Sequence, residues 1–231
     1  MINTVLFDFV NTIAFLTPLR EDILIKYCQE QHNINFSKKQ IQKIYMDVDE
    51  QNPYSSVTIK TNKDKKNFYK KYNQTLFSKL RISGAENYYD FYHSVEKSWS
   101  LDKCIPELLN SLKSNNISIG IISNFDDNLE DILENLKIKH MFNFIVVSAQ
   151  VGLEKPNTEL YEYVKKQYEI NINNSIYIGD SYNLDYIPAS EAGFKTFLID
   201  RQDIINKKIN KIKNLNEIKE ILSSNDRFCL V

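Results

Sequence analysis

Residues 4–8 read Thr4-Val5-Leu6-Phe7-Asp8, a short apolar run that ends at a carboxylate. A short strand without polar alternation is typical of a parallel sheet that helices cover on both faces. Later apolar runs are interpreted as further strands of the same sheet: Ile117 to Ile122, Phe144 to Val147, Ser175 to Ile178 and Thr196 to Ile199. Together these runs predict a parallel β-sheet that begins with the Thr4–Phe7 strand.

The intervals between these strands have apolar residues at helical spacing. Helices are expected over about 104–115, 126–137, 157–168 and 184–192, with a terminal helix over about 215–222. Strands that alternate with helices predict a doubly wound α/β fold. The polar and basic run Asn206 to Lys213 is interpreted as a solvated loop or helix face.

The interval after the first strand differs because its pattern is helical throughout. Helical periodicity is found at about 20–31, 38–50, 65–80 and 85–98, without a convincing strand. We therefore expect residues 1–13 and 99–231 to form the α/β core, and residues 14–98 to form an inserted helical domain.

Composition excludes several classes of protein. The 231 residues are 42% hydrophobic, too apolar for a disordered chain, and no apolar run approaches the length of a membrane helix. The chain has 29 Lys and Arg against 30 Asp and Glu, so it lacks the excess of positive charge that is typical of nucleic-acid-binding proteins. Three widely spaced cysteines and the absence of a signal-peptide pattern favour a reducing compartment. We expect a cytoplasmic protein, monomeric or homodimeric, with a small-molecule substrate and neither nucleic acid nor membrane as a partner.

Polar residues follow the carboxyl ends of the predicted strands, where ligands bind in open α/β sheets. Asp8 follows the first strand, with Thr12 shortly after it, and Ser123-Asn124 follows the second. The remaining candidates come after the third and fourth strands: Lys155, Asp180 and Asp185. We expect all of these side chains to converge on one site.

The chemistry of such a site is coherent. Carboxylates that lie close together repel one another unless cations separate them. Lys155 supplies one positive charge, and a hard divalent ion with oxygen ligands, such as Mg²⁺, would supply the rest. A site of this kind suits a phosphate dianion, which Asp8 would attack at phosphorus to give an aspartyl-phosphate that water then hydrolyses.

The chain resembles the haloacid dehalogenase-like (HAD) hydrolase superfamily in four motifs that occur in the expected order. These are Phe7-Asp8-Phe9-Val10-Asn11-Thr12, Ile121-Ile122-Ser123-Asn124, Glu154-Lys155-Pro156-Asn157, and Ile178-Gly179-Asp180-Ser181 with Asp185. Within it, the sections Ser123 to Asp126 and Gly179 to Tyr186 resemble most the branch called haloacid dehalogenase-like hydrolase domain-containing protein 3. The resemblance implies a Rossmann-like parallel sheet as core and an inserted, all-helical cap of the C1 type.

The resemblance also implies a role for each candidate residue. Asp8 and Lys155 would be catalytic, with Asp8 as the nucleophile. Thr12, Ser123, Asn124 and Lys155 would bind phosphate. Mg²⁺ would be held by Asp8, the backbone carbonyl of Val10 and Asp180, with Asp185 mostly orienting the metal's ligand shell.

One position departs from the pattern of the family's phosphatases. They carry a second Asp two residues after the nucleophile, which protonates the leaving group and then activates water. Here that position is Val10, which cannot move a proton. Asn11 stands where the family usually has Gly, but Asn tolerates unusual backbone angles better than most residues.

The departure leaves several functions open. One is hydrolysis of a small phosphorylated or phosphonate metabolite whose leaving group needs no acid, such as an acyl phosphate. Another is a non-catalytic protein that binds a phosphorylated ligand or has lost its chemistry. A third is a 2-haloacid dehalogenase, a function that Asp180 disfavours because an added carboxylate would repel a carboxylate substrate.

Overall fold

A computed structural model of the chain describes residues 2–52 and 62–227. The chain forms two compact units, one of residues up to Phe15 together with those from Trp99 onward, and one of Leu16–Ser98. The first boundary therefore lies after Phe15 rather than after Ile13. The larger unit contains every candidate residue named above.

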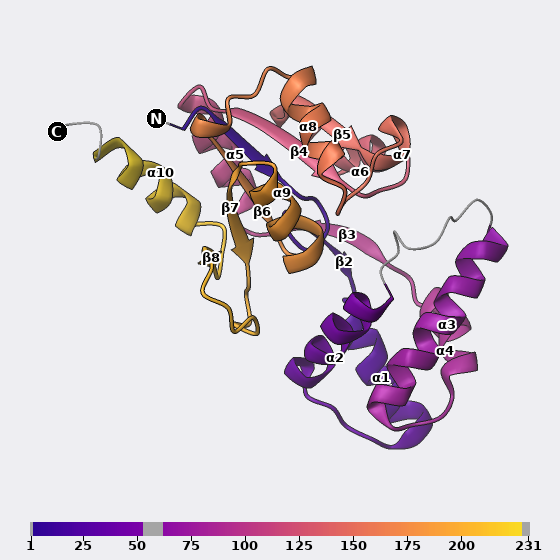
Figure 1. The fold of residues 1–231 in the computed structure, drawn as a ribbon. Helices are drawn as coiled ribbons and strands as arrows, with labels where there is room; N and C mark the ends of the chain where they lie inside the picture. The colour runs from indigo at the N-terminus through magenta and orange to yellow at the C-terminus, as the bar shows by residue number, and fades with distance from the viewer. Residues whose placement is uncertain (1, 53–61, 228–231) are drawn as a thin grey trace. The chain divides into compact units, whose positions relative to one another are not determined.

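The larger unit contains a six-stranded sheet in the order β5-β4-β1-β6-β7-β8, in which every pairing is parallel (Figure 1). Its strands are β1 (Thr4–Phe7), β4 (Ser118–Ser123), β5 (Phe144–Val147), β6 (Ser175–Gly179), β7 (Lys195–Ile199) and β8 (Lys211–Ile212). The predicted doubly wound parallel sheet is confirmed. Because β4 and β5 lie on one side of β1, and β6 to β8 on the other, the chain reverses direction across the sheet at β1, the point where such folds bind ligands.

Helices cover both faces of this sheet, as the alternation of residues along β1 illustrates. Val5 and Phe7 are buried against α5 (Ile105–Ser114), α6 (Leu129–Asn135) and α10 (Glu217–Arg227). Leu6 points the opposite way, into a second apolar cluster with α8 (Thr158–Gln167) and α9 (Ile187–Glu191). Burial on both faces explains why the strand is apolar at every position after Thr4.

Three local expectations were wrong. The run expected to be a solvated loop or helix face contains β8, whose Ile212 is buried against the sheet. The helix expected over about 184–192 is a π-helical turn, η4 (Tyr182–Tyr186), followed by α9. The last helix expected before the core, α4, ends at Ser94, because the chain then forms β3 (Ser98–Leu101), which pairs with β2 (Ala14–Thr17).

The smaller unit has an apolar core of its own. Its described helices are α1 (Arg20–His32), α2 (Lys38–Gln51), α3 (Asn62–Leu80) and α4 (Ala85–Ser94). Leu24, Leu76 and Phe77 are buried between them, and Tyr27 donates a hydrogen bond of 2.9 Å to the carbonyl of Gly84. Ser37 begins α2 with a capping box in which its side chain and that of Gln40 satisfy each other's backbone N–H groups.

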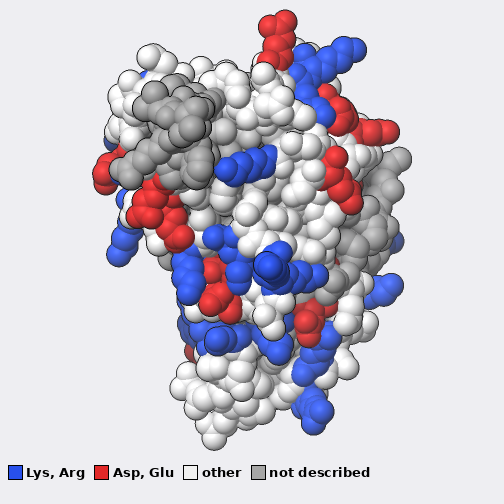
Figure 2. Space-filling view, turned by 60° about the vertical axis from the view of Figure 1, so that its left-hand side comes forward, with Lys and Arg blue, Asp and Glu red and all other residues white. Residues whose placement is uncertain are grey.

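Charge is mixed over the surface. Figure 2 shows Lys and Arg side chains lying among Asp and Glu side chains on the face that it draws, in keeping with the net charge of −1. Among the residues that the structure describes, the helices are too short or too polar to cross a membrane.

Candidate active site

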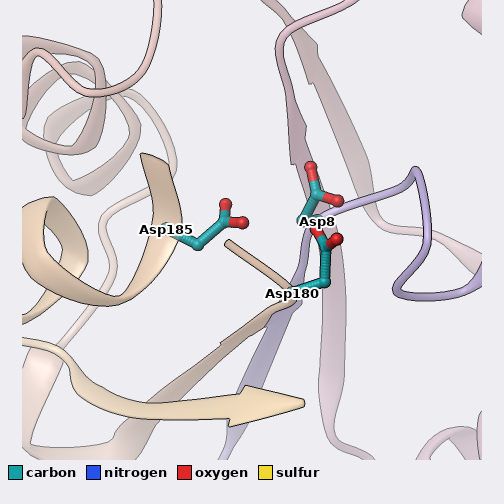
Figure 3. Close-up of side chains that lie close together, drawn as sticks. All are labelled: Asp8, Asp180 and Asp185. Atoms are coloured by element: carbon teal, nitrogen blue, oxygen red, sulfur yellow. The ribbon is translucent and has the colours of Figure 1, made fainter. Parts of the chain in front are cut away.

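The carboxyl edge of the sheet brings the candidate residues together within the larger unit. Asp8 directly follows β1, Ser123 is the last residue of β4, and Asp180 directly follows β6. Figure 3 shows Asp8, Asp180 and Asp185 close together, and one carboxylate oxygen from each lies within 4.8 Å of the others. The register explains this convergence, because Phe7 is the partner of both Ile121 and Ile178, so the ends of the three strands lie within two residues of one another.

Lys155 occupies the centre of this group. Its side chain is 3% exposed, and its Nζ lies 2.6 Å from Oδ1 of Asp8 and 2.6 Å from Oδ1 of Asp185. Burial lowers the pKa of the ammonium group, but the charges of Asp185 and Asp8 outweigh burial and raise this pKa well above its ordinary value. Lys155 therefore stays charged and neutralises part of the carboxylate cluster.

Asn124 holds the backbone of Lys155 in place. The Asn124 side-chain amide donates to the Lys155 carbonyl at 2.8 Å, and the Lys155 N–H donates to Oδ1 of Asn124 at 2.8 Å. Both ends of the carboxamide are thus used to position Lys155. Asn124 was expected to bind phosphate, and because its side chain is used in this way, that role stays a prediction only for its backbone N–H.

Asp185 is oriented by several donors. Its Oδ1 accepts from Lys155 and, at 2.7 Å, from the hydroxyl of Tyr177, while its Oδ2 accepts from the Ser181 N–H at 3.0 Å. Gly179 permits this approach, because a Cβ there would lie 2.4 Å from the Cβ of Asp185. Asp185 was expected among the metal ligands, and this bonding suits the orienting role rather than direct ligation.

The nucleophile candidate and its acidic neighbour both have a pKa above the ordinary value of a carboxyl group. Burial is the main cause that raises the pKa of Asp8 to about 6, against the lowering effect of Lys155. Burial and the charge of Asp8 raise the pKa of Asp180 to about 8, although a hydrogen bond from Asn11 lowers it. One lysine therefore does not neutralise the cluster, which leaves room for another cation.

The turn after β1 carries the departure from the phosphatase pattern. Val10 is half-buried and packs against the apolar core of the larger unit. Asn11 has a φ of 58°, in the left-handed region that Asn adopts more readily than most residues. Thr12 is buried, and its hydroxyl donates to Oδ2 of Asp8 at 3.3 Å, so it bonds the nucleophile candidate itself.

Ser123 has an unsatisfied hydroxyl. It is 1% exposed, and its Oγ has no hydrogen-bond partner in the described part of the chain. A buried hydroxyl left without a partner costs about 1–3 kcal/mol, so a group that persists in this state suggests a ligand. An anion at the carboxyl edge of β4 would supply that partner.

Two residues near the site were missed by the sequence analysis. Tyr177 lies in β6, where its hydroxyl donates to Asp185 and accepts from Nζ of Lys155 at 3.3 Å. Arg201 follows β7 and contacts the turn after β1. The signals were a hydroxyl inside an apolar strand and an arginine just beyond a strand's carboxyl end.

Comparison with known proteins identifies a family model and several relatives of this chain. The family model described as haloacid dehalogenase-like hydrolase matches residues 5–199. Haloacid dehalogenase-like hydrolase domain-containing protein 3 of Xenopus laevis is 29% identical over 131 residues, which cover 52% of this chain and 53% of the relative. Glyceraldehyde 3-phosphate phosphatase of Methanothermobacter thermautotrophicus is 28% identical over 144 residues, covering 57% and 63%. The chain spans about half the length of the curated relatives that it matches first.

Solved structures share the fold. The HAD-hydrolase YfnB of Bacillus subtilis, in a form bound to magnesium, superposes with a TM-score of 0.66 at 20% identity, covering 96% of this chain and 98% of that one. A dehalogenase with an intermediate complex superposes with a TM-score of 0.67 at 16% identity, covering 95% and 96%. Identities this low establish a common fold and leave the reaction open.

Proposed function

The chain belongs to the haloacid dehalogenase-like hydrolase family, and from that premise we propose that it hydrolyses a small phosphorylated or phosphonate metabolite, with Asp8 as the nucleophile. The name of one relative, glyceraldehyde 3-phosphate phosphatase, supports phosphoryl chemistry. We further propose that Leu16–Ser98 acts as the cap that gives substrate specificity, since it is inserted in the chain between Asp8 and Ser123.

One observation carries the proposal, namely that a buried ammonium group and a hydroxyl without a hydrogen-bond partner among the described residues accompany the carboxylate of Asp8. Lys155 lies 2.6 Å from Asp8, and Ser123 ends the strand beside β1 with its Oγ unsatisfied. A phosphate dianion would gain a charge-assisted bond from Lys155 and give Ser123 the partner that it lacks. Packing alone does not account for this combination of groups.

The reaction follows from these positions. A carboxylate oxygen of Asp8 attacks phosphorus, a P–O bond to Asp8 forms, and the bond from phosphorus to the leaving group breaks. Water then attacks the phosphorus of the aspartyl-phosphate, which releases inorganic phosphate and restores the carboxylate. Lys155 and Ser123 hold phosphoryl oxygens, and Thr12 orients Asp8 through its hydroxyl.

Val10 restricts the substrates. General acid–base help contributes roughly 10²–10⁴ in rate, and a valine side chain cannot provide it. Leaving groups that depart without a proton, such as the carboxylate of an acyl phosphate, need no acid in the first step, whereas the loss of a base for the attacking water affects every substrate alike. We therefore propose acyl phosphates and other substrates with good leaving groups as preferred over alkyl phosphate esters.

The donor set fits Mg²⁺. Carboxylate oxygens from three Asp residues lie within 4.8 Å of one another. Burial, and after it the charges of Asp8 and Asp185, raise the pKa of Asp180 despite the opposing charge of Lys155. Asp8 and Asp180 would hold the ion with the carbonyl of Val10, and Asp185 would orient the surrounding groups. When bound, Mg²⁺ neutralises phosphoryl oxygens and draws the dianion to the edge of the sheet.

The proposed function is tested by phosphate release from acetyl phosphate and from glyceraldehyde 3-phosphate, with and without Mg²⁺. We expect Mg²⁺-dependent release that is faster from acetyl phosphate. Equal rates would place a proton donor elsewhere in the chain. Binding of inorganic phosphate without turnover of either substrate would favour a binding protein, and metal-free halide release from 2-haloacids would favour a dehalogenase.

A further inference from the structure

Arg201 contacts the turn that follows the nucleophile candidate. It lies just after β7, at the same edge of the sheet as Asp8. One guanidinium nitrogen donates to the carbonyl of Asn11 at 2.5 Å, and the other donates to the carbonyl of Thr12 at 2.9 Å. The side chain is 25% exposed, so these bonds are partly shielded from water.

The carbonyls of Asn11 and Thr12 need donors from outside the turn, because the turn's own hydrogen bonds are accepted by other carbonyls. The N–H groups of Ile13 and Ala14 donate to the carbonyl of Phe9, and the N–H of Asn11 donates to the carbonyl of Ala14. In the described part of the chain, the donors recorded for the carbonyls of Asn11 and Thr12 come from Arg201. The left-handed backbone of Asn11, with a φ of 58°, is a conformation that surrounding contacts must maintain.

Asp102 fixes the direction of the guanidinium group. Its Oδ2 accepts from Arg201 at 2.8 Å, and its Oδ1 accepts from the Cys104 N–H at 2.9 Å. The backbone N–H of Asp102 donates to the carbonyl of Ile13 at 2.9 Å, so the same residue also bonds the turn directly. The guanidinium carbon of Arg201 lies 4.8 Å from the ring centre of Phe15, which adds a cation–π contact.

We propose that Arg201, oriented by Asp102, is a positioning residue for the loop that carries Asp8. The turn sends the Thr12 hydroxyl into the site, where it bonds Asp8. The Asn11 side chain lies close enough to Asp180 to lower the pKa of that carboxyl group. Arg201 binds the carbonyls of these same two residues. Loss of Arg201 therefore frees both side chains at once, without removing any group that touches the substrate.

The expected fall in kcat rests on the proposed function, whereas the expected loosening of the turn after Asp8 does not. Displacement of a reacting group by about 1 Å can cost about 10²-fold in rate. We expect Arg201→Met to lower kcat by about tenfold to a hundredfold with little change in KM, because Lys155 and Ser123 keep their positions. Arg201→Lys should recover only part of kcat, since an ammonium group does not match the fork of the guanidinium.

Hydrogen exchange tests the positioning without any substrate. The full chain is compared with Arg201→Met, Arg201→Lys and Asp102→Asn, and with Lys139→Met as control, since Lys139 bridges Glu130 and Glu134 beside the opposite edge strand. Exchange is followed in peptides that cover Phe9–Ala14, with β4 as internal reference. We expect about tenfold or faster exchange in the turn of Arg201→Met and Asp102→Asn, and no change in β4.

The outcomes are distinct. Unchanged exchange in the turn of both Arg201→Met and Asp102→Asn would overturn the proposal, whether or not the wild type has phosphatase activity. Faster exchange in the turn with wild-type kcat would overturn the kinetic part. If a variant also exchanges faster in β4, it has lost global stability. The test is then Arg201→Lys, which retains the positive charge. An exchange rate in the Phe9–Ala14 turn between those of the wild type and Arg201→Met supports the proposal, and the wild-type rate overturns it.

Discussion

Lys155 and Asp8 are 147 positions apart in the chain, yet Nζ of Lys155 lies 2.6 Å from Oδ1 of Asp8 inside the protein. The same Nζ lies 2.6 Å from Asp185, so one cation serves two buried carboxylates. Asp180 adds a third carboxylate with no ammonium group of its own in the described site. The carboxylates described at this edge therefore outnumber the single ammonium group of Lys155.

Restoring the missing acid should broaden the substrate range. Val10→Asp places a carboxyl group two residues after Asp8, where the proton donor of the family's phosphatases lies. We expect turnover of glyceraldehyde 3-phosphate to rise toward the roughly 10²–10⁴-fold limit of general acid catalysis, with acetyl phosphate turnover changed far less. Steady-state phosphate release from both substrates measures this.

Val10→Asn is the matched control, because it is polar and of similar size to Asp but cannot donate a proton as an acid. It should leave the preference for acetyl phosphate intact. Equal gains in Val10→Asp and Val10→Asn would contradict the assignment of Val10 as a lost acid.

Removing the Ser123 hydroxyl should lower activity without lowering the stability of the fold. Ser123→Ala deletes a buried group without a recorded partner, so the free energy of unfolding should stay equal or rise by about 1 kcal/mol. Activity should fall about tenfold or more, mainly through weaker phosphate binding. Chemical denaturation and kinetics on the same preparation compare the two, and a clear loss of stability would show that Ser123 has a structural partner instead.

Lys155→Met should destabilise the fold as well as stop catalysis. It leaves Asp8 and Asp185 buried without their cation, and breaking a buried ion pair in this way costs about 3–5 kcal/mol. Urea denaturation at neutral pH measures the loss of stability. Lys139→Met, which removes an exposed ion pair with Glu130, is the control, and its free energy of unfolding should change little. Equal stability of the two variants would contradict the central role given to Lys155.

Stability without metal should fall as pH rises from about 4 to about 8. The pKa of Asp180 is raised to about 8 in the fold and lies near 3.9 in the unfolded chain, so the native state holds the extra proton in this range. Asp8, with a pKa of about 6, acts in the same direction over the lower part of the range. Thermal unfolding in EDTA across this range measures the slope.

Asp180→Asn and Mg²⁺ provide the controls for that slope. The variant should match the wild type near pH 4 and exceed its melting temperature near pH 8. Mg²⁺ should raise the melting temperature of the wild type at pH 8 but not that of Asp180→Asn. A slope that is the same in both proteins would mean that other groups set the pH dependence.

The parallel sheet could be predicted because burial on both faces requires a continuous apolar run in the sequence. The runs Thr4–Phe7 and Phe144–Val147 were placed correctly, since helices cover them on both sides and every inward position must be apolar. The β2–β3 pair and the short strand β8 have no such apolar run. Residues 98–101 are exposed or half-buried, and β8 has only Lys211 and Ile212.

The grouping of the candidate residues at one edge of the sheet was predicted, but the hydrogen bonds among them were not. Parallel strands bring their carboxyl ends to one edge, which is enough to group Asp8, Ser123 and Asp180. It does not reveal that the side-chain amide of Asn124 bonds the backbone of Lys155, because that contact joins two loops 31 positions apart in the chain. The position of Arg201 just beyond β7 was a local signal, but its contact with Asn11, 190 positions away, has no signature in the sequence.

The central claim is that Asp8 is a nucleophile that carries the phosphoryl group. The most direct test is acid quenching during turnover of acetyl phosphate with Mg²⁺, followed by mass spectrometry of the Asp8 peptide in the wild type and in Asp8→Asn. The account predicts a phosphoryl adduct on the wild-type peptide, no adduct on Asp8→Asn, and a loss of phosphate release of about 10³-fold or more in that variant. Phosphate release that persists in Asp8→Asn at the wild-type rate would contradict it.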